Sequence, residues 1–231
     1  MRKYFFILAL VLAQTPPAMA GEKIVLDDLR SQNYESIIST KDQTPRFTFH
    51  APKGLNPSHF MGGVVGIVMH TRAAERGSEI LSQYEVTEPA FDISKELARL
   101  IGERLQLSYM FQDSGLNSSI AATHFTLRSA KYLSDEYGPD RLVINVGTNM
   151  WSLSGTGNSK FRIIYAASAQ LVDTRNRRVL AKSGCSFPLK KAHSARDAET
   201  MFDNDAASLK AEFQEATDFC INRIMSDFFR S

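Results

Sequence analysis

Residues 141–187, RLVINVGTNMWSLSGTGNSKFRIIYAASAQLVDTRNRRVLAKSGCSF, decide the fold of this chain. Apolar side chains recur at every second position in long parts of this stretch, which is the period of a β-strand. The clusters SGTGNS at 154–159 and DTRNRR at 173–178 are typical turn sequences and separate three such segments. Because short connections join antiparallel neighbours, the sequence predicts an antiparallel β-meander.

The alternation also predicts which side chains share a face of each strand. In the first strand, one face is expected to carry Leu142, Ile144, Val146, Thr148 and Met150. The opposite face is expected to carry Val143, Asn145, Gly147, Asn149 and Trp151. In the second strand, one face is expected to carry Phe161, Ile163, Tyr165, Ala167, Ala169 and Leu171.

Two amphipathic helices flank the predicted strands in sequence. The first covers about 89–106, with Pro89 in its first turn and Thr87 or Glu88 as its cap. Its apolar positions follow steps of three and four residues: Ile93, Leu97, Leu100, Ile101 and Leu105. The second begins at about Asp205 and carries the stripe Leu209, Phe213, Ala216, Cys220, Ile224 and Phe228. Helices packed on one face of an antiparallel meander make the predicted fold class α+β.

The two cysteines, Cys185 and Cys220, are expected to form a structural disulfide. An even number of cysteines in an exported chain favours a bridge. It would tie the last helix to the third strand of the meander. Two buried free thiols are the alternative. A zinc site is disfavoured because the two residues lack a metal-ligand spacing, and no metal site is predicted.

The first residues, MRKYFFILALVLAQTPPAMAG, have the layout of a secretory signal peptide. A basic start and an apolar run precede Ala18-Met19-Ala20, so we predict cleavage after Ala20 and a periplasmic protein. An uncleaved anchor is the alternative, but the apolar run is short for a membrane span. Residue 21 is Gly rather than Cys, which argues against lipid attachment.

The charge balance argues against nucleic-acid binding. The chain has 27 basic and 25 acidic residues, and loss of Arg2 and Lys3 with the signal peptide leaves 25 of each. Bulk binding of nucleic acid needs an excess of basic side chains. After the signal peptide, no apolar run is long enough for a transmembrane segment.

Three regions follow from this pattern: a signal peptide at 1–20, an irregular amino-terminal extension at 21–60 and a single α+β domain at 61–231. The extension is proline-rich and is expected to contain at most one short edge strand, RFTFH at 46–50, with Phe47 and Phe49 on one face. Between 107 and 140 we expect a strand in LSYMFQ and a short helix around 127–137.

Two candidate interaction surfaces stand out. The stretch MGGVVGIVMHTR at 61–72 lacks the lysine of a phosphate-binding loop and the spacing of a dinucleotide turn. We interpret it as a packing surface, either inside the domain or against a partner or membrane, through Gly62, Gly63, Val65, Gly66 and Met69. The second surface is the hairpin tip with Arg175, Arg177 and Arg178, which either meets an anionic surface or is an ordinary solvated turn.

No motif predicts catalysis or cofactor binding. The sequence contains no H-E-x-x-H pair and no G-x-S-x-G elbow, and the predicted bridge would consume both thiols. No catalytic, cofactor-binding or metal-binding residue is therefore predicted.

The strands of 140–187 and the cysteine-bearing last helix, together with EPAFDISKELARLIGERL at 88–105, resemble uncharacterised proteobacterial exported proteins and lipoproteins. Their layout is similar to the TolB amino-terminal and CsgG type of envelope domain. This resemblance implies a non-enzymatic accessory or binding protein in envelope assembly or transport, with an envelope protein as partner. The alternatives are a hydrolase with a site of dispersed residues and a small-ligand-binding protein, and the oligomeric state is left open.

Overall fold

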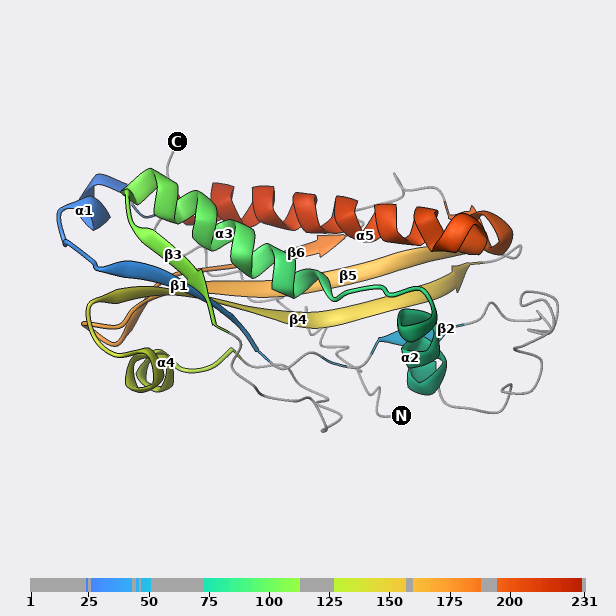
Figure 1. The fold of residues 1–231 in the computed structure, drawn as a ribbon, viewed down its shortest axis with the longest axis horizontal. Coiled ribbons are helices and arrows are strands. Elements are labelled where there is room, and N and C mark those ends of the chain that lie inside the picture. The colour runs from blue at the N-terminus through green and yellow to red at the C-terminus, as the bar shows by residue number, and fades with distance from the viewer. Residues whose placement is uncertain are drawn as a thin grey trace, which may run out of the picture.

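The structure is a computed structural model that describes residues 24, 26–42, 45, 47–50, 73–112, 127–156, 160–187 and 195–229. Its helices are α1 (Leu26–Arg30), α2 (Ala73–Gln83), α3 (Pro89–Leu105), α4 (Ala130–Tyr137) and α5 (Ala198–Phe228). Its strands are β1 (Ser36–Lys41), β2 (Thr48–His50), β3 (Ser108–Phe111), β4 (Arg141–Thr156), β5 (Lys160–Asp173), β6 (Arg178–Phe187) and β7 (Arg196–Asp197). Figure 1 shows α3 and α5 on one side of a long sheet and α4 on the other.

The sheet has the strand order β3-β1-β4-β5-β6, with β2 also pairing with β4 and β7 with β5. β4, β5 and β6 are consecutive antiparallel strands, so the predicted α+β class and the meander are both confirmed. The sheet is extended beyond the meander by β1, which lies parallel to both β3 and β4. Parallel neighbours need a long connection, and here α2 and α3 lie in the chain between β1 and β3.

The prediction that 21–60 is irregular with at most an edge strand is wrong at 36–41. This segment forms β1, which lies inside the sheet between β3 and β4, and its residues 36–40 are all buried. A six-residue strand carries too little periodicity to be recognised alone, and its place depends on pairing with segments more than 70 residues away. The predicted strand at 46–50 is present as β2. Phe47 belongs to the main core, the large apolar cluster that includes the buried faces of α3 and α5, and Phe49 packs against this core. The boundaries predicted at 20 and 60 lie outside the described residues.

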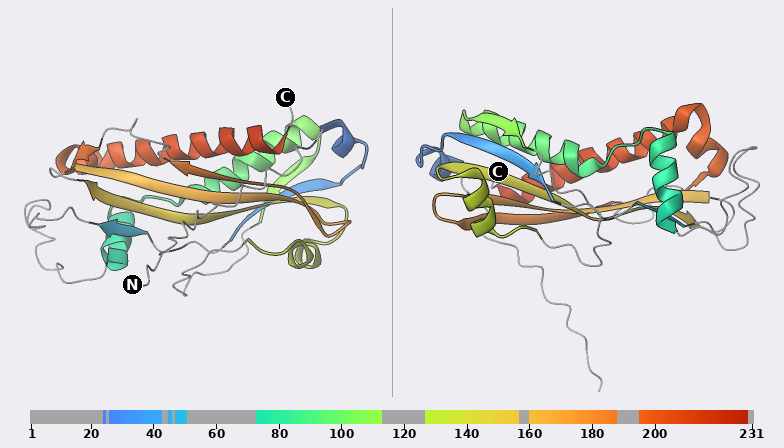
Figure 2. Two further views of the ribbon diagram at one scale, coloured as in Figure 1. Left: turned by 180° about the vertical axis from the view of Figure 1, so that it is seen from behind. Right: turned by 60° about the horizontal axis from the view of Figure 1, so that its bottom comes forward.

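One face of the sheet is covered by α3 and α5, which lie side by side in both views of Figure 2. α3 covers Pro89–Leu105 with Glu88 and Gln106 as its caps, close to the predicted 89–106. The predicted positions Ile93, Leu97 and Ile101 are fully buried. In α5 the helix is interrupted at 203–206 by non-helical backbone angles. The predicted apolar stripe therefore starts after this break, and every one of its six residues is buried.

The predicted disulfide is present between Cys185 on β6 and Cys220 on α5, with the Cα atoms 5.3 Å apart. Both residues are buried, so the bridge lies within the layer between helix and sheet. It joins two elements that are separated by 35 residues in the sequence. The bridge therefore holds the last helix on the third strand of the meander.

A β-bulge in β4 changes the predicted face of Trp151. The register with β5 shifts between Thr148 and Met150, so one extra residue is inserted on β4. Beyond the bulge, Trp151 faces the main core with Leu142 and Ile144, whereas Met150 is 46% exposed. The prediction that Met150 shares the face of Leu142 is therefore wrong, because a single bulge reverses the alternation that follows it.

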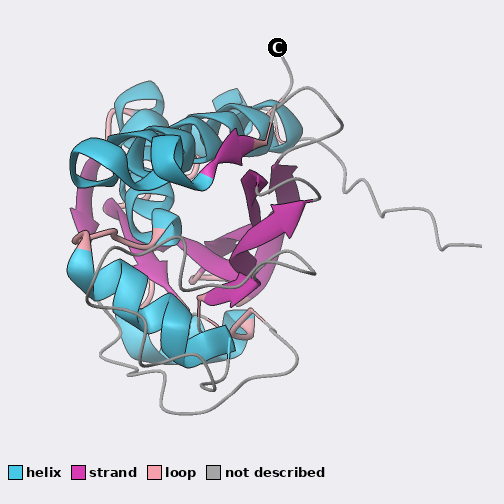
Figure 3. Ribbon diagram, turned by 90° about the vertical axis from the view of Figure 1, so that its right-hand side faces the viewer, coloured by secondary structure: helices cyan, strands magenta, loops and turns pink. Residues whose placement is uncertain are grey.

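The second face of the sheet is covered at one end by α4, and Figure 3 shows helices on both sides of the strands. Leu133 and Tyr137 of α4 pack on Ile38, Val143 and Val172 in a small separate core. The sequence predicts this short helix at about 127–137, and it begins where the Ser129 side chain accepts a hydrogen bond from the Tyr132 amide. Helices thus pack on both faces, with the larger core on the side of α3 and α5.

The helix α2 packs against β2, where Gly77 lies directly over the backbone of Phe47. A Cβ atom added at Gly77 would lie 2.1 Å from the Phe47 carbonyl oxygen, so no larger residue fits without movement of the helix.

Among the described residues, no helix is both long enough and apolar enough to cross a membrane. The predicted signal peptide and the stretch 61–72 lie outside the described residues.

Candidate functional site

The arginines of the β5–β6 turn each face a carboxylate of the chain. The Arg175 guanidinium pairs with Asp140 and also donates to the Gln32 carbonyl oxygen. Arg177 and Arg178 approach carboxylates of Asp135 and Asp173 at 3.0 Å and 3.4 Å. These pairs reduce the positive charge that the turn offers to an anionic surface, and such a role for the turn stays a prediction. The glycine-rich candidates Gly62, Gly63, Val65, Gly66 and Met69 lie outside the described residues.

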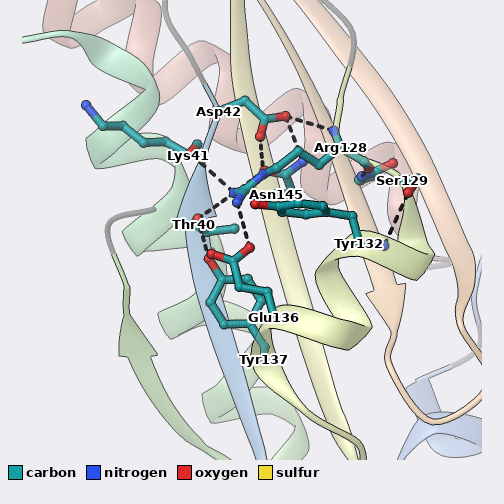
Figure 4. Close-up of polar contacts among 10 residues, drawn as sticks. Thr40, Lys41, Asp42, Arg128, Ser129, Tyr132, Glu136, Tyr137 and Asn145 are labelled. Atoms are coloured by element: carbon teal, nitrogen blue, oxygen red, sulfur yellow. Dashed lines mark hydrogen bonds and ion pairs between the residues drawn. The ribbon is translucent and has the colours of Figure 1, made fainter. Parts of the chain in front are cut away.

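A buried polar network lies on the second face of the sheet, beside the small core, and is drawn in Figure 4. Its centre is Arg128, which precedes α4 and whose side chain is 11% exposed. The Arg128 Nε donates to Asp42 Oδ1, and its backbone amide donates to Asp42 Oδ2 at 3.1 Å. The other two guanidinium nitrogens donate to Glu136 Oε2 at 2.9 Å and to Thr40 Oγ1 at 2.7 Å. One side chain thus links the end of β1 to α4.

The neighbouring strands complete this network. The Asn145 amide on β4 donates to Asp42 Oδ2 at 2.9 Å, and the Gln170 amide on β5 donates to the Arg128 carbonyl oxygen at 2.6 Å. Burial by itself lowers the pKa of Arg128, but nearby charges, chiefly the Asp42 carboxylate, raise it above its ordinary value. The guanidinium is therefore charged, and each of its three nitrogens donates to a group of the chain.

The geometry indicates a structural clamp. Each of the three guanidinium nitrogens of Arg128 donates to a group of the chain, so the side chain is held in place by the elements around it. A buried charge is tolerated where it is paired and its hydrogen bonds are satisfied, which is the arrangement here. Sequence reasoning missed this cluster because its members are spread from residue 40 to 170. The available signal was the polar pair Asn145 and Gln170 inside otherwise apolar strands.

A second polar cluster anchors the start of α3. The Thr148 hydroxyl donates to Glu88 Oε1 at 2.6 Å and lies 3.2 Å from the Tyr165 hydroxyl. The Lys41 ammonium is 3.6 Å from the other oxygen of Glu88. Burial raises the pKa of the Tyr165 phenol far above its ordinary value, so this group stays neutral. The cluster joins α3 to β1, β4 and β5, and its polar groups are occupied with one another.

A groove between α3 and α5 is a candidate binding surface among the described residues. It has a volume of about 830 Å³ and is lined by Asp92, Lys95, Glu96, Leu100, Gln214, Thr217, Asp218, Ile221 and Asn222. A smaller hollow of about 220 Å³ shares Asp92, Gln214 and Thr217 with it and continues toward Glu85 and Val86. Half-buried Leu100 and buried Ile221 form an apolar floor, and charged side chains form the rim. A mixed surface of this kind can bind a peptide segment.

Within the described ranges, no group of three His, Cys, Asp or Glu side chains is arranged to hold a metal ion.

No family model matches the sequence, and no curated protein matches it. The similar solved structures have low sequence identity and low TM-scores.

A Xanthomonas campestris protein of the DUF330 family is 10% identical, with a TM-score of 0.34 over 80% of this chain and 77% of that one. A lipoprotein from Neisseria meningitidis is 12% identical, with a TM-score of 0.33 over 79% and 95% of the two chains. A Helicobacter pylori protein described as a homologue of the neuraminyllactose-binding hemagglutinin is 8% identical, with a TM-score of 0.25 over 81% and 79%. With scores below 0.5, these likenesses carry no conclusion about family or function.

Proposed function

We propose that this protein is an exported, non-enzymatic accessory protein of the bacterial cell envelope that binds another envelope protein during assembly or transport. The buried disulfide between Cys185 and Cys220 carries the first half of this proposal. Disulfides of this structural kind form and persist in oxidising compartments such as the periplasm. The signal-peptide pattern, with cleavage after Ala20, and the resemblance to TolB amino-terminal and CsgG type domains agree with it.

The binding half of the proposal is supported by the groove between α3 and α5. The side chains of the two buried polar clusters bond mainly to one another, whereas the groove presents apolar and charged groups together on the outside of the helical layer. Surfaces with an apolar centre and a polar rim are typical of protein interfaces.

Two measurements test the two halves of the proposal. Mass spectrometry of the protein from the periplasmic fraction is expected to find an amino-terminal Gly21 and an oxidised cysteine pair. Recovery of the reduced, full-length chain from the cytoplasm would refute export.

For binding, p-benzoylphenylalanine is placed at Asn222 in the groove or at Tyr132 on α4, and intact cells are irradiated. Tyr132 is half exposed and lies on the other side of the sheet, so it is a matched position. An adduct with a defined envelope protein is expected from at least one of the two positions. Absence of any protein adduct from both positions would refute the accessory function.

A further inference from the structure

The charges that line the α3–α5 groove do not cancel. The lining of the groove and its smaller extension includes the carboxylates of Glu85, Asp92, Glu96 and Asp218 and the ammonium groups of Lys95 and Lys210. Four acidic groups thus face two basic ones, although the mature chain as a whole is expected to be neutral. The excess of negative charge is a local property of this groove.

Both ammonium groups contact other groups of the same chain. The Lys210 Nζ lies 2.6 Å from Asp205 Oδ2, and the Lys95 Nζ lies 5.0 Å above the centre of the Phe91 ring. Neither is therefore held by an acidic group of the groove. The excess negative charge of the lining is not neutralised from within it.

The acidic groups differ in how they are compensated. Glu96 is paired with Arg99, whose Nε donates to it at 2.7 Å. Glu85, Asp92 and Asp218 form no ion pair within the described part of the chain, and Asp218 only accepts a hydrogen bond from the neutral Gln214 amide at 2.9 Å. Asp92 comes from α3 and Asp218 from α5, so uncompensated carboxylates stand on both helices that form the groove.

Apolar groups lie on the floor between these carboxylates. Leu100 of α3 packs partly against the main core, and Ile221 of α5 is only 8% exposed. The buried Thr217 hydroxyl donates to the Phe213 carbonyl oxygen, so its hydrogen is already bonded within α5. The groove therefore offers apolar contact at its centre and unpaired negative charge on both sides.

From this arrangement we propose that the α3–α5 groove binds a basic amphipathic segment of the envelope partner, with an apolar side chain on Leu100 and Ile221 and lysine or arginine side chains toward Asp92 and Asp218. This rests on the proposed function, because it names the part of the partner that is bound. Charge complementarity selects the occupant, since opposite charges across an interface favour the correct partner and like charges reject others. An anionic lipid surface is excluded by the same carboxylates.

The test uses the oxidised mature protein and a fluorescein-labelled helical peptide with leucines on one face and lysines beside them. Its match is the same peptide with glutamate in place of each lysine. Fluorescence anisotropy is expected to show binding of the lysine peptide that weakens with added salt, and none of the glutamate peptide.

The variant Asp92→Asn/Asp218→Asn is expected to bind the lysine peptide about tenfold more weakly, as two exposed ion pairs are removed. The control Asp28→Asn/Glu79→Gln makes the same change of charge at exposed positions outside the groove and is expected to bind normally. Circular dichroism and thermal unfolding check that both variants are folded. Equal binding of the two peptides, or equal affinity of the two variants, would overturn the proposal.

Photocrosslinking separates this failure from that of the proposed function. An envelope protein that crosslinks from Tyr132 and never from Asn222 overturns the groove assignment and leaves the accessory function standing. If neither position gives an adduct although the protein binds the lysine peptide, the accessory function is overturned.

Discussion

Replacing Arg128 by Met is the sharpest test of the clamp on the second face of the sheet. The substitution keeps much of the length and apolar volume of the side chain but removes its charge and its donors. It leaves the Asp42 carboxylate, which is 5% exposed, without its cation. Asn145 still donates to Asp42, but a single amide does not replace a guanidinium.

The expected loss is large for one substitution. Removing one member of a buried, hydrogen-bonded ion pair costs about 3–5 kcal/mol, because the remaining charge stays buried without compensation. This is a considerable part of the about 5–15 kcal/mol that holds a typical domain folded. Adding Asp42→Asn to Arg128→Met removes the stranded charge and is expected to recover about 2 kcal/mol of that loss.

The assay is urea unfolding followed by the fluorescence of Trp151, the single tryptophan of the chain. This residue is 6% exposed and its ring centre lies 5.0 Å from that of Phe47, so unfolding changes its surroundings strongly. The matched control is Arg177→Met. Arg177 pairs with Asp135 at 3.0 Å, but both side chains are more than half exposed. Such a pair contributes less than about 1 kcal/mol.

The reasoning is refuted if Arg128→Met costs no more than Arg177→Met, since the two substitutions differ mainly in burial. It is also refuted if Asp42→Asn adds to the loss, because the stranded carboxylate would then not be its source.

Three further predictions follow from single features of the fold. Replacing Cys185 and Cys220 by Ala is expected to lower the free energy of unfolding by about 4 kcal/mol in urea titrations, from the entropy of a 35-residue loop; a reductant should destabilise the wild type and leave the variant unchanged. Gly77→Ala is expected to lower the melting temperature although alanine favours helices, because its Cβ meets the Phe47 carbonyl oxygen at 2.1 Å; an unchanged melting temperature would contradict this packing. Burial, with the nearby Asp173 carboxylate, raises the pKa of Tyr34 to about 12, so its neutral form stabilises the fold below about pH 10 and this stability is lost as the pH rises toward 12. Urea midpoints should therefore fall more steeply with alkaline pH in the wild type than in Tyr34→Phe, and identical slopes would remove Tyr34 as the cause.

Much of the architecture could be predicted because it follows from the periodicity of apolar residues within single segments. The stripes of α3 and α5 and the alternation of β5 need only the period of a helix or a strand and a core to face. The candidate site is different, since the clamp around Arg128 depends on which segments become neighbours. Thr40, Asn145 and Gln170 lie on three strands, and no spacing along the chain connects them.

The sequence by itself determined the α+β class, the three-stranded meander, the faces of the two long helices and the one pairing open to Cys185 and Cys220. Each of these follows from the pattern within one segment or from the presence of only two cysteines. Tertiary structure alone decided that 36–41 is an inner strand and that Trp151 faces the main core. It also decided that carboxylates of α3 and α5 line one groove. The physical reason is that strand pairing, a bulge and the packing of two helices are set by contacts between distant segments, which a local pattern does not contain.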